Sequence, residues 1–241
     1  MGLTTRISGC VGGHISLTHY VSGEVCRAHR HEGAQISLLL SGDYREDGSA
    51  GRVVAHDGLL TGKPAGFEHE TVFGDLGALI LSVNLDEAPF LKTYVAGQSP
   101  AGVRNVLLAK AAAGDLDRLV PTRFDQSARA DLVVLPPAWL EQAHYTLGTQ
   151  AESSIHGLAR KAGMHPVTFS RLFRDALGRP PIVVRQSCRA ARALQAIIRS
   201  TAGLIEIALD SGFADQAHMT RAVRQITGYP PARLRRMFAA V

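Results

Sequence analysis

The chain has 241 residues, of which 46% are hydrophobic and 20% are charged. This composition excludes an intrinsically disordered chain and provides enough apolar material for two modest domains. Its apolar runs fall far short of the roughly 18 residues that a membrane-spanning helix needs, and no signal-peptide core follows Met1. Three scattered cysteines (Cys10, Cys26 and Cys188) argue against a disulfide framework. We therefore expect a soluble, cytoplasmic protein with no membrane partner.

Charge is divided unevenly along the chain. The total is +5, but residues 150–241 carry 14 Lys and Arg against 5 Asp and Glu, whereas residues 1–149 carry 12 against 16. A basic C-terminal half beside an acidic N-terminal half is typical of a phosphate-binding module joined to a sensing or oligomerising module. Solvated arginine-rich helices would give the same balance, so charge alone leaves both interpretations open.

Residues 7–85 are predicted to form a small β-barrel or sandwich. They lack helical periodicity and contain short apolar runs, separated by turn signals at residues 41–43, 46–49, 56–58 and 73–77. His29, His31 and Gln35 share parity, so on one unbulged strand they point to the same face. His69 would arrive from a later strand, and Cys26 has the opposite parity to His29 and is expected to face away.

This region resembles the cupin superfamily. The residues at the intervals of the two cupin motifs are Gly23, His29, His31, position 35 and Gly42, then Gly58, Pro64, Gly66 and His69. Gln35 and Phe73 depart from the pattern, since cupins usually have Glu and Asn there. The resemblance implies a jelly-roll barrel that holds a divalent metal through His29, His31 and His69, with Gln35 as a weak fourth ligand. Imidazoles suit Zn, Ni, Cu or Fe; the alternative is a pocket without metal, empty or filled by an organic ligand.

From residue 86 the pattern becomes helical. We expect a short helix from Ala88 to Tyr94, a second over residues 102–110, and a third over 132–147 that is interrupted by Pro136 and Pro137. A polar linker follows at residues 148–153. These helices are expected either to pair two subunits in a homodimer or to cover the open face of the barrel.

Residues 154–238 contain one pattern twice. In the first copy an apolar helix over 155–162 ends at Gly163, and a second helix opens at Pro166. In the second copy a helix over 204–210 ends before Gly212, and Asp215 can cap a helix that runs to Ile226. Each copy is predicted to be a helix-turn-helix unit, whose second helix enters the major groove of DNA.

This half resembles the AraC/XylS family of bacterial transcription regulators. The matching stretches are residues 158–164, 169–174, 177–181, 205–221 and 226–231. The resemblance implies seven helices, with two helix-turn-helix units joined by a central helix over about 182–199. His165 departs from the pattern, because a Ser cap is usual there, and so does Val184, where an aromatic residue is usual. The predicted domains are therefore a sensor barrel (1–85), a helical subdomain with linker (86–150) and a DNA-binding domain (151–241).

The exposed faces of the two second helices supply the candidate DNA contacts. Phe169, Leu172 and Phe173 have the spacing of core residues, as do Met219 and Val223 in the second copy. The candidates for base contact are Val167, Ser170 and Arg171 in the first copy, and Gln216, Ala217, Thr220 and Arg221 in the second. Arg174 and Arg224, one turn further along, are expected to meet phosphates. The alternative for each arginine is a solvated surface charge.

These patterns predict a transcription regulator that binds a double-stranded DNA operator and responds to a small molecule or metal in the barrel, with RNA polymerase as a partner if it activates. The competing class is a metal-dependent cupin enzyme, such as a dioxygenase or isomerase, with an accessory basic domain. Glu32 and Glu68, the acidic neighbours of the histidines in sequence, have the wrong parity to act as acid or base. We therefore expect no enzymatic activity. A third class is an architectural DNA binder with an inactive barrel.

Overall fold

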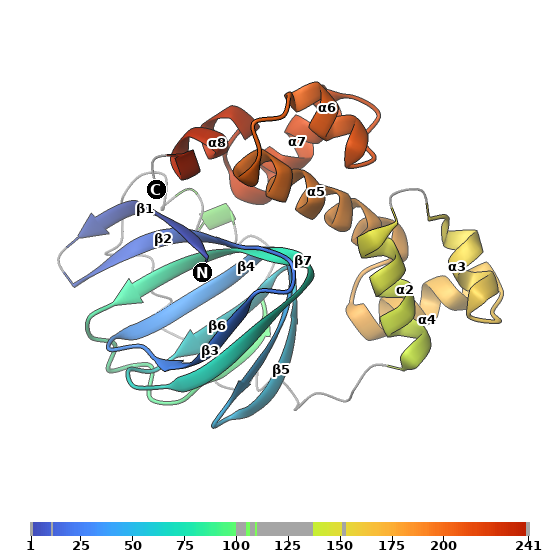
Figure 1. The fold of residues 1–241 in the computed structure, drawn as a ribbon. Helices are drawn as coiled ribbons and strands as arrows, with labels where there is room; N and C mark the ends of the chain where they lie inside the picture. Colours follow the sequence, from blue (N-terminus) through green and yellow to red (C-terminus); the bar gives the residue numbers. More distant parts are fainter. Residues whose placement is uncertain are drawn as a thin grey trace.

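A computed structural model describes residues 2–10, 12–99, 105–106, 109, 137–150 and 153–239. An antiparallel sheet comes first and a group of helices follows (Figure 1). The strands are β1 (Leu3–Cys10), β2 (Gly13–Tyr20), β3 (Val25–Arg30), β4 (Ala34–Gly48), β5 (Gly51–His56), β6 (Leu59–Lys63), β7 (Glu68–Leu85) and β8 (Val95–Gln98). The helices are α2 (Ala138–Thr149), α3 (Ile155–Lys161), α4 (Pro166–Leu177), α5 (Pro181–Arg199), α6 (Leu204–Asp210), α7 (Gln216–Thr227) and α8 (Pro231–Ala239). None of these helices is both long and apolar enough to cross a bilayer.

The sheet domain (residues 3–98) is organised around two long strands. β4 has 15 residues and β7 has 18, and they pair with each other along most of their length. The main path of the sheet is β1-β2-β7-β4-β6-β8, while β3 joins β7 and β5 joins β4 outside this path. The sheet therefore curves around an interior, as the ribbon shows (Figure 1).

Two turns predicted from the sequence, at residues 41–43 and 73–77, are wrong, because the chain bends there inside continuous strands. Gly42 has a φ of 97° and Gly77 a φ of 60°, values that favour glycine. A Cβ atom on Gly42 would lie only 2.0 Å from the carbonyl oxygen of Gly77. The register of β4 against β7 shifts beside Gly42, as expected for a β-bulge. Glycine marks a bend here, and the pairing of β4 with β7 resumes beyond it, at Gly42 opposite Ala78.

The sheet extends beyond the predicted domain boundary at residue 85. β8 pairs with β6 from Leu59 opposite Gln98 to Gly62 opposite Val95. The helix predicted from Ala88 to Tyr94 does not form in this described stretch. Six of the nine residues of the helix predicted over 102–110 lie outside the described residues, and the other three are helical. α2 begins directly after Pro137.

The helical half repeats one three-helix arrangement, α3–α4–α5 and then α6–α7–α8. In each copy the middle helix ends at a glycine with positive φ, Gly178 at 67° and Gly228 at 75°. A Pro-Pro pair then opens the next helix, α5 or α8. The prediction of a long central helix is confirmed by α5, and Asp215 caps α7 as predicted, since its Oδ1 accepts from the backbone N–H of His218 at 2.7 Å.

Small residues allow the helices of each pair to approach closely. Ala159 in α3 and Ala208 in α6 are fully buried. Phe169 and Phe173 form the core face of α4 as predicted. Leu172 was predicted to be buried with them, but 37% of it is exposed. At i+3 from Phe169 and i−1 from Phe173, its side chain falls at the edge of the buried stripe.

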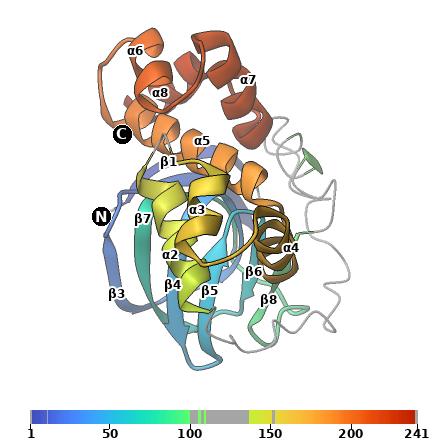
Figure 2. The same cartoon turned by 90° about the vertical axis from the view of Figure 1, so that its right-hand side faces the viewer.

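α5 lies between the sheet domain and the helices α6, α7 and α8 (Figure 2). It contacts β4 and β7 on one side and α2, α6, α7 and α8 on others. One cluster of buried side chains contains Ile36 and Leu81 of the sheet together with Leu194 and Ile197 of α5. The two halves therefore share apolar packing, and burial of such side chains contributes about 1.5–3 kcal/mol each.

Candidate functional site

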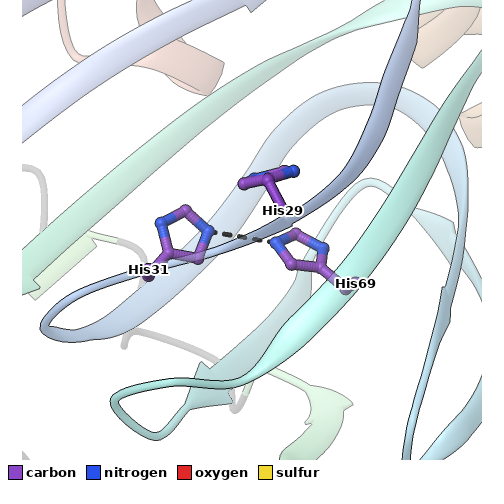
Figure 3. A group of neighbouring side chains, drawn as sticks. All are labelled: His29, His31 and His69. Atoms are coloured by element: carbon purple, nitrogen blue, oxygen red, sulfur yellow. Dashed lines mark hydrogen bonds between the residues drawn. The ribbon is translucent and has the colours of Figure 1, made fainter.

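Three imidazoles meet where β3 runs beside the start of β7 (Figure 3). His29 and His69 are direct partners in the antiparallel register, and His31 follows the end of β3. Their candidate ligand nitrogens all lie within 4.8 Å of one another. The structure thus brings together the three histidines that the sequence singled out, with His69 buried, His31 half-buried and His29 exposed.

A bulge in β3 changes which residues face the histidines. Cys26 pairs with Thr71 and His29 pairs with His69, so β3 advances three residues where β7 advances two. The extra residue reverses the alternation of side chains. Cys26 consequently lines the same cavity as the histidines. The expectation that it faces away was based on an unbulged strand and is wrong.

Below the histidines lies a buried charged network. The Glu46 carboxylate is 2.7 Å from the Lys63 ammonium and 2.9 Å from Nδ1 of His69. Both Glu46 and Lys63 have side chains at most 5% exposed. Burial alone would raise the pKa of Glu46, but Lys63 and His69 outweigh it and lower the pKa to about 2. Glu46 is therefore ionised, and it is paired well enough to remain so in the interior.

Hydrogen bonding directs the Nε2 atoms toward one another. Burial lowers the pKa of His69, so its ring is neutral, and Nδ1–H donates to Glu46. That leaves Nε2 as the acceptor of a 3.0 Å hydrogen bond from Nε2 of His31, drawn in Figure 3. On His29, Nδ1 bonds the Arg27 carbonyl at 2.9 Å, which leaves its Nε2 free.

These donors fit a transition metal with imidazole ligands. Three converging nitrogens suit a site in which solvent or another molecule takes the remaining position. The Glu46–His69 contact is the carboxylate support commonly seen behind a ligating histidine. Burial, with Lys63 next, lowers the pKa of His31 to about 4, so that ring too is neutral and able to ligate.

Sequence reasoning missed Glu46 and Lys63. Glu46 falls in the turn predicted at residues 46–49, and Lys63 was not singled out as a candidate. In the structure each lies within a strand, β4 or β6, and points inward. The sequence offers no alternating signal for Glu46, because its neighbours Arg45 and Asp47 are charged as well.

Gln35 lines the same cavity but is engaged elsewhere. Its amide nitrogen donates to Asn84 at 2.9 Å, and its amide oxygen accepts from Ser37 at 3.0 Å. The role of Gln35 as a fourth ligand therefore stays a prediction and would require those bonds to rearrange. The cavity itself has a volume of about 70 Å³. Hydroxyl groups from Ser16, Thr18, Ser37, Thr71 and Ser82 line much of it, beside the stacked rings of Tyr20 and Phe73.

The candidate DNA contacts occupy equivalent places on α4 and α7. Both helices have 12 residues, and the predicted contacts fall at the second, fifth, sixth and ninth positions of each. These pairs are Val167 and Ala217, Ser170 and Thr220, Arg171 and Arg221, and Arg174 and Arg224; Gln216 comes at the first position of α7. Val167 is 70% exposed. The four arginines are exposed and form no ion pair with any residue in the described part of the chain.

The start of α4 is capped by an unusual group. His165 Nδ1 accepts from the backbone N–H of Val167 at 3.3 Å, a long hydrogen bond. The departure from Ser that the sequence shows at this position therefore leaves the helix with a cap, but one longer than the 2.7 Å bond that Asp215 makes at α7. The position of α4, and of the residues it presents, depends on this cap and on the buried Phe169 and Phe173.

Comparison with known proteins identifies the helical half. A family model described as a helix-turn-helix domain matches residues 158–237. The HTH-type transcriptional regulator ExsA of Pseudomonas aeruginosa is 30% identical over 84 residues, which cover 35% of this chain. This part of the chain is thus similar to helix-turn-helix transcription regulators, in agreement with the AraC/XylS resemblance of its sequence. The match spans only 30% of ExsA, so the likeness covers about a third of the length of this curated relative.

Solved structures give more distant matches to this chain. ToxT from Vibrio cholerae aligns with 95% of this chain and 99% of its own, at 10% identity and a TM-score of 0.44. An AraC-type transcriptional regulator from Chromobacterium violaceum aligns with 42% of this chain and 92% of its own, at 24% identity and a TM-score of 0.40. The DNA-binding domain of AdpA, solved in complex with a target DNA, aligns with 42% of this chain and 93% of its own, at 26% identity and a TM-score of 0.39.

Proposed function

We propose that the chain is a transcription regulator that binds double-stranded DNA through two helix-turn-helix units, α3–α4 and α6–α7. The observation that carries this proposal is the equivalent placement of exposed Arg171 and Arg221 at the sixth residue of α4 and α7. An arginine on such a helix can donate two hydrogen bonds to guanine, and a second arginine one turn later can bind phosphate. The family of the helical half supports the same function.

The two reading helices differ in their other side chains. α4 presents Val167 and Ser170 where α7 presents Ala217 and Thr220, and only α7 begins with a glutamine, Gln216. If α5 holds both units on one side of the duplex, the helices enter successive major grooves about 34 Å apart. One chain then reads two different half-sites, and the DNA site has no palindrome within it.

The test uses duplexes selected from a randomised library by the wild-type protein. Arg171→Ala and Arg221→Ala are each expected to weaken binding by about 1–3 kcal/mol and to relax the preference at different positions of the site. Arg52→Ala is the matched control, because Arg52 is an exposed arginine of the sheet domain. Binding of both variants at wild-type strength would show that these helices do not read DNA.

We infer that the sheet domain is a cupin-like jelly roll and that its cavity is the sensing site. The support is the cluster of three imidazoles beside a cavity rich in hydroxyl groups. Glu46 is the one carboxylate among the described residues lining the cavity, and Lys63 and His69 already hold it. Because that carboxylate is not free to act as a general base, the arrangement favours sensing over catalysis. The effector is then a divalent metal (Zn, Ni, Cu or Fe) or a small molecule. The regulator acts as a homodimer, and it contacts RNA polymerase if it activates transcription.

Metal analysis of the purified protein tests the sensing site. The wild type is expected to hold close to one transition metal per chain, and His69→Ala to hold none. His14→Ala is the control, because His14 is a histidine of the same domain outside the cluster. Footprinting with and without chelator then shows whether the metal alters DNA binding. A metal-free wild type that does not take up Zn²⁺ would leave a small molecule as the effector.

A further inference from the structure

One acidic side chain of the sheet domain reaches into the helical half. Asp57 lies in the turn between β5 and β6, and both of its oxygens accept from the guanidinium of Arg179, one of them at 2.5 Å. Ser187 of α5 donates a further hydrogen bond to Asp57 at 3.0 Å. Burial would raise the pKa of Asp57, but the contact with Arg179 lowers it, so the carboxylate is ionised. This is a bidentate charged pair, among the strongest side-chain contacts in proteins.

The partners of Asp57 stand next to the proposed reading helices. Arg179 follows directly after Gly178, the residue that ends α4. Asp57 and Arg179 also line a cleft together with Arg221 and His218 of α7. The carboxylate is therefore placed between the end of one reading helix and the side of the other.

A second contact joins the sheet domain to the helical half, but it does not pair opposite charges. Arg199 at the end of α5 donates to Nδ1 and to the backbone carbonyl of His19, at 3.1 and 3.0 Å. Burial, with Arg199 next, lowers the pKa of His19 to about 4, so this ring is neutral. The contact of Arg199 thus neutralises no charge. Asp57–Arg179, by contrast, sets an acid of the sheet domain against a base of the helical half.

We propose that Asp57 competes with DNA phosphate for Arg179. The carboxylate occupies a cation of the DNA-binding half and adds negative charge beside Arg221, so the sheet domain lowers DNA affinity until this contact opens. The inference rests on the proposed DNA-binding function. Its physical basis is that each arginine or lysine that pairs with a phosphate releases a counterion, and an arginine already paired with a carboxylate cannot.

The sharpest test is the salt dependence of DNA binding. Binding of the full chain to a mixed-sequence duplex is measured by fluorescence anisotropy over a range of salt concentrations. Asp57→Asn keeps the shape of the side chain and is expected to tighten binding about tenfold near 0.1 M salt. It should also steepen the plot of log affinity against log salt by about 0.9, the contribution of one phosphate contact.

Two controls separate this effect from a change of net charge. Asp47→Asn removes the same charge from an exposed carboxylate that pairs with Arg45 and Arg52 inside the sheet domain, and it should leave affinity and slope near wild type. Adding Arg179→Ala to Asp57→Asn should remove the gain in slope. A result in which Asp57→Asn binds no more tightly than the wild type, or in which Asp47→Asn matches it, would overturn the proposal.

Thermal melts check that each variant is folded. Asp57→Ser, which suits a turn, serves as a second variant with the same expected result. If the wild type binds no duplex at all, the proposed function fails. If the wild type binds but both Asp57 variants behave like it, only the competition fails.

Discussion

Glu46 shows how one residue decides the chemistry of its surroundings. Its carboxylate balances the buried ammonium of Lys63 and also fixes the proton of His69 on Nδ1. The same oxygen, Oε2, makes both contacts. Because Lys63 is only 5% exposed, it has no solvent to replace a lost partner.

Glu46→Gln is expected to lower the free energy of unfolding by about 3–5 kcal/mol, since it leaves the Lys63 charge buried and unpaired. Urea titration followed by far-ultraviolet circular dichroism measures it. Glu68→Gln breaks an exposed pair with Arg30, whose side chains are 49% and 69% exposed, and should cost less than about 1 kcal/mol. Equal losses in the two variants would mean that burial of the Glu46 network contributes nothing.

At the scale of elements, strand continuity depends on glycine where two backbones come close. Gly42 and Gly12 both have positive φ, at 97° and 86°. A side chain on Gly12 would meet nothing within 4 Å, whereas one on Gly42 would meet the backbone of Gly77. Alanine substitutions at Gly12 and Gly42 therefore separate the cost of a left-handed backbone from the cost of a steric clash.

Gly12→Ala should therefore cost about 1 kcal/mol, the strain of a left-handed conformation alone. Gly42→Ala should cost several times more, because the ladder between β4 and β7 must separate. Chemical denaturation of both variants gives the comparison. A Gly42→Ala protein as stable as Gly12→Ala would show that the bend tolerates a side chain.

The helix caps give a second test at this scale. His165→Ser should stabilise the protein by about 1 kcal/mol, because Ser is a better N-cap than the long His165 contact. Asp215→Ser replaces one good cap with another and should change the free energy of unfolding by only about a few tenths of a kcal/mol. Thermal melts that show no gain for His165→Ser would contradict this expectation.

For the whole molecule, the contact between sheet and helices contains neutral histidines. Burial, with Arg199 next, lowers the pKa of His19 to about 4, against a smaller opposing effect of Glu24. Burial, with His144 next, lowers that of His56 to about 3, and Asp57 and Arg179 also face it. His144 of α2, whose ring lies 4.6 Å from that of His56, has its pKa lowered as well, chiefly by burial. The folded protein therefore binds fewer protons than the unfolded chain in mild acid.

The contribution of these histidines to the free energy of unfolding is expected to be fully present above their ordinary pKa of about 6.5. It should fall as the pH drops toward 4, by about 1.4 kcal/mol per pH unit for each histidine. Urea midpoints at about pH 7.5 and pH 5 measure this. His19→Asn removes one of these histidines. It should reduce the slope of the free energy of unfolding against pH by the contribution of one proton, about 1.4 kcal/mol per pH unit. Equal stability at the two pH values would mean that these rings accept protons while the fold stays intact.

Local signals predicted most of the helical half but only part of the sheet domain. Gly163, Gly212 and Asp215 act on residues a few positions away, so spacing alone located the helix pairs. The bends at Gly42 and Gly77 were taken for turns because their strand pairing is long-range. His29 and His31 were found by parity and His69 through the cupin resemblance, whereas the contact of Asp57 with Arg179 joins residues 122 positions apart and leaves no local pattern.

β7 connects the imidazole cluster with the surface that the helices contact. His69 of the imidazole cluster and Leu76, which packs with Leu140 of α2 and Val184 of α5, belong to the same strand. Seven residues separate them, and the pairing with β4 passes from Phe73 directly to Ala78, so Leu76 lies in the bulge of the strand. The strand that carries His69 therefore leads, through one bend, to the surface on which the helices rest.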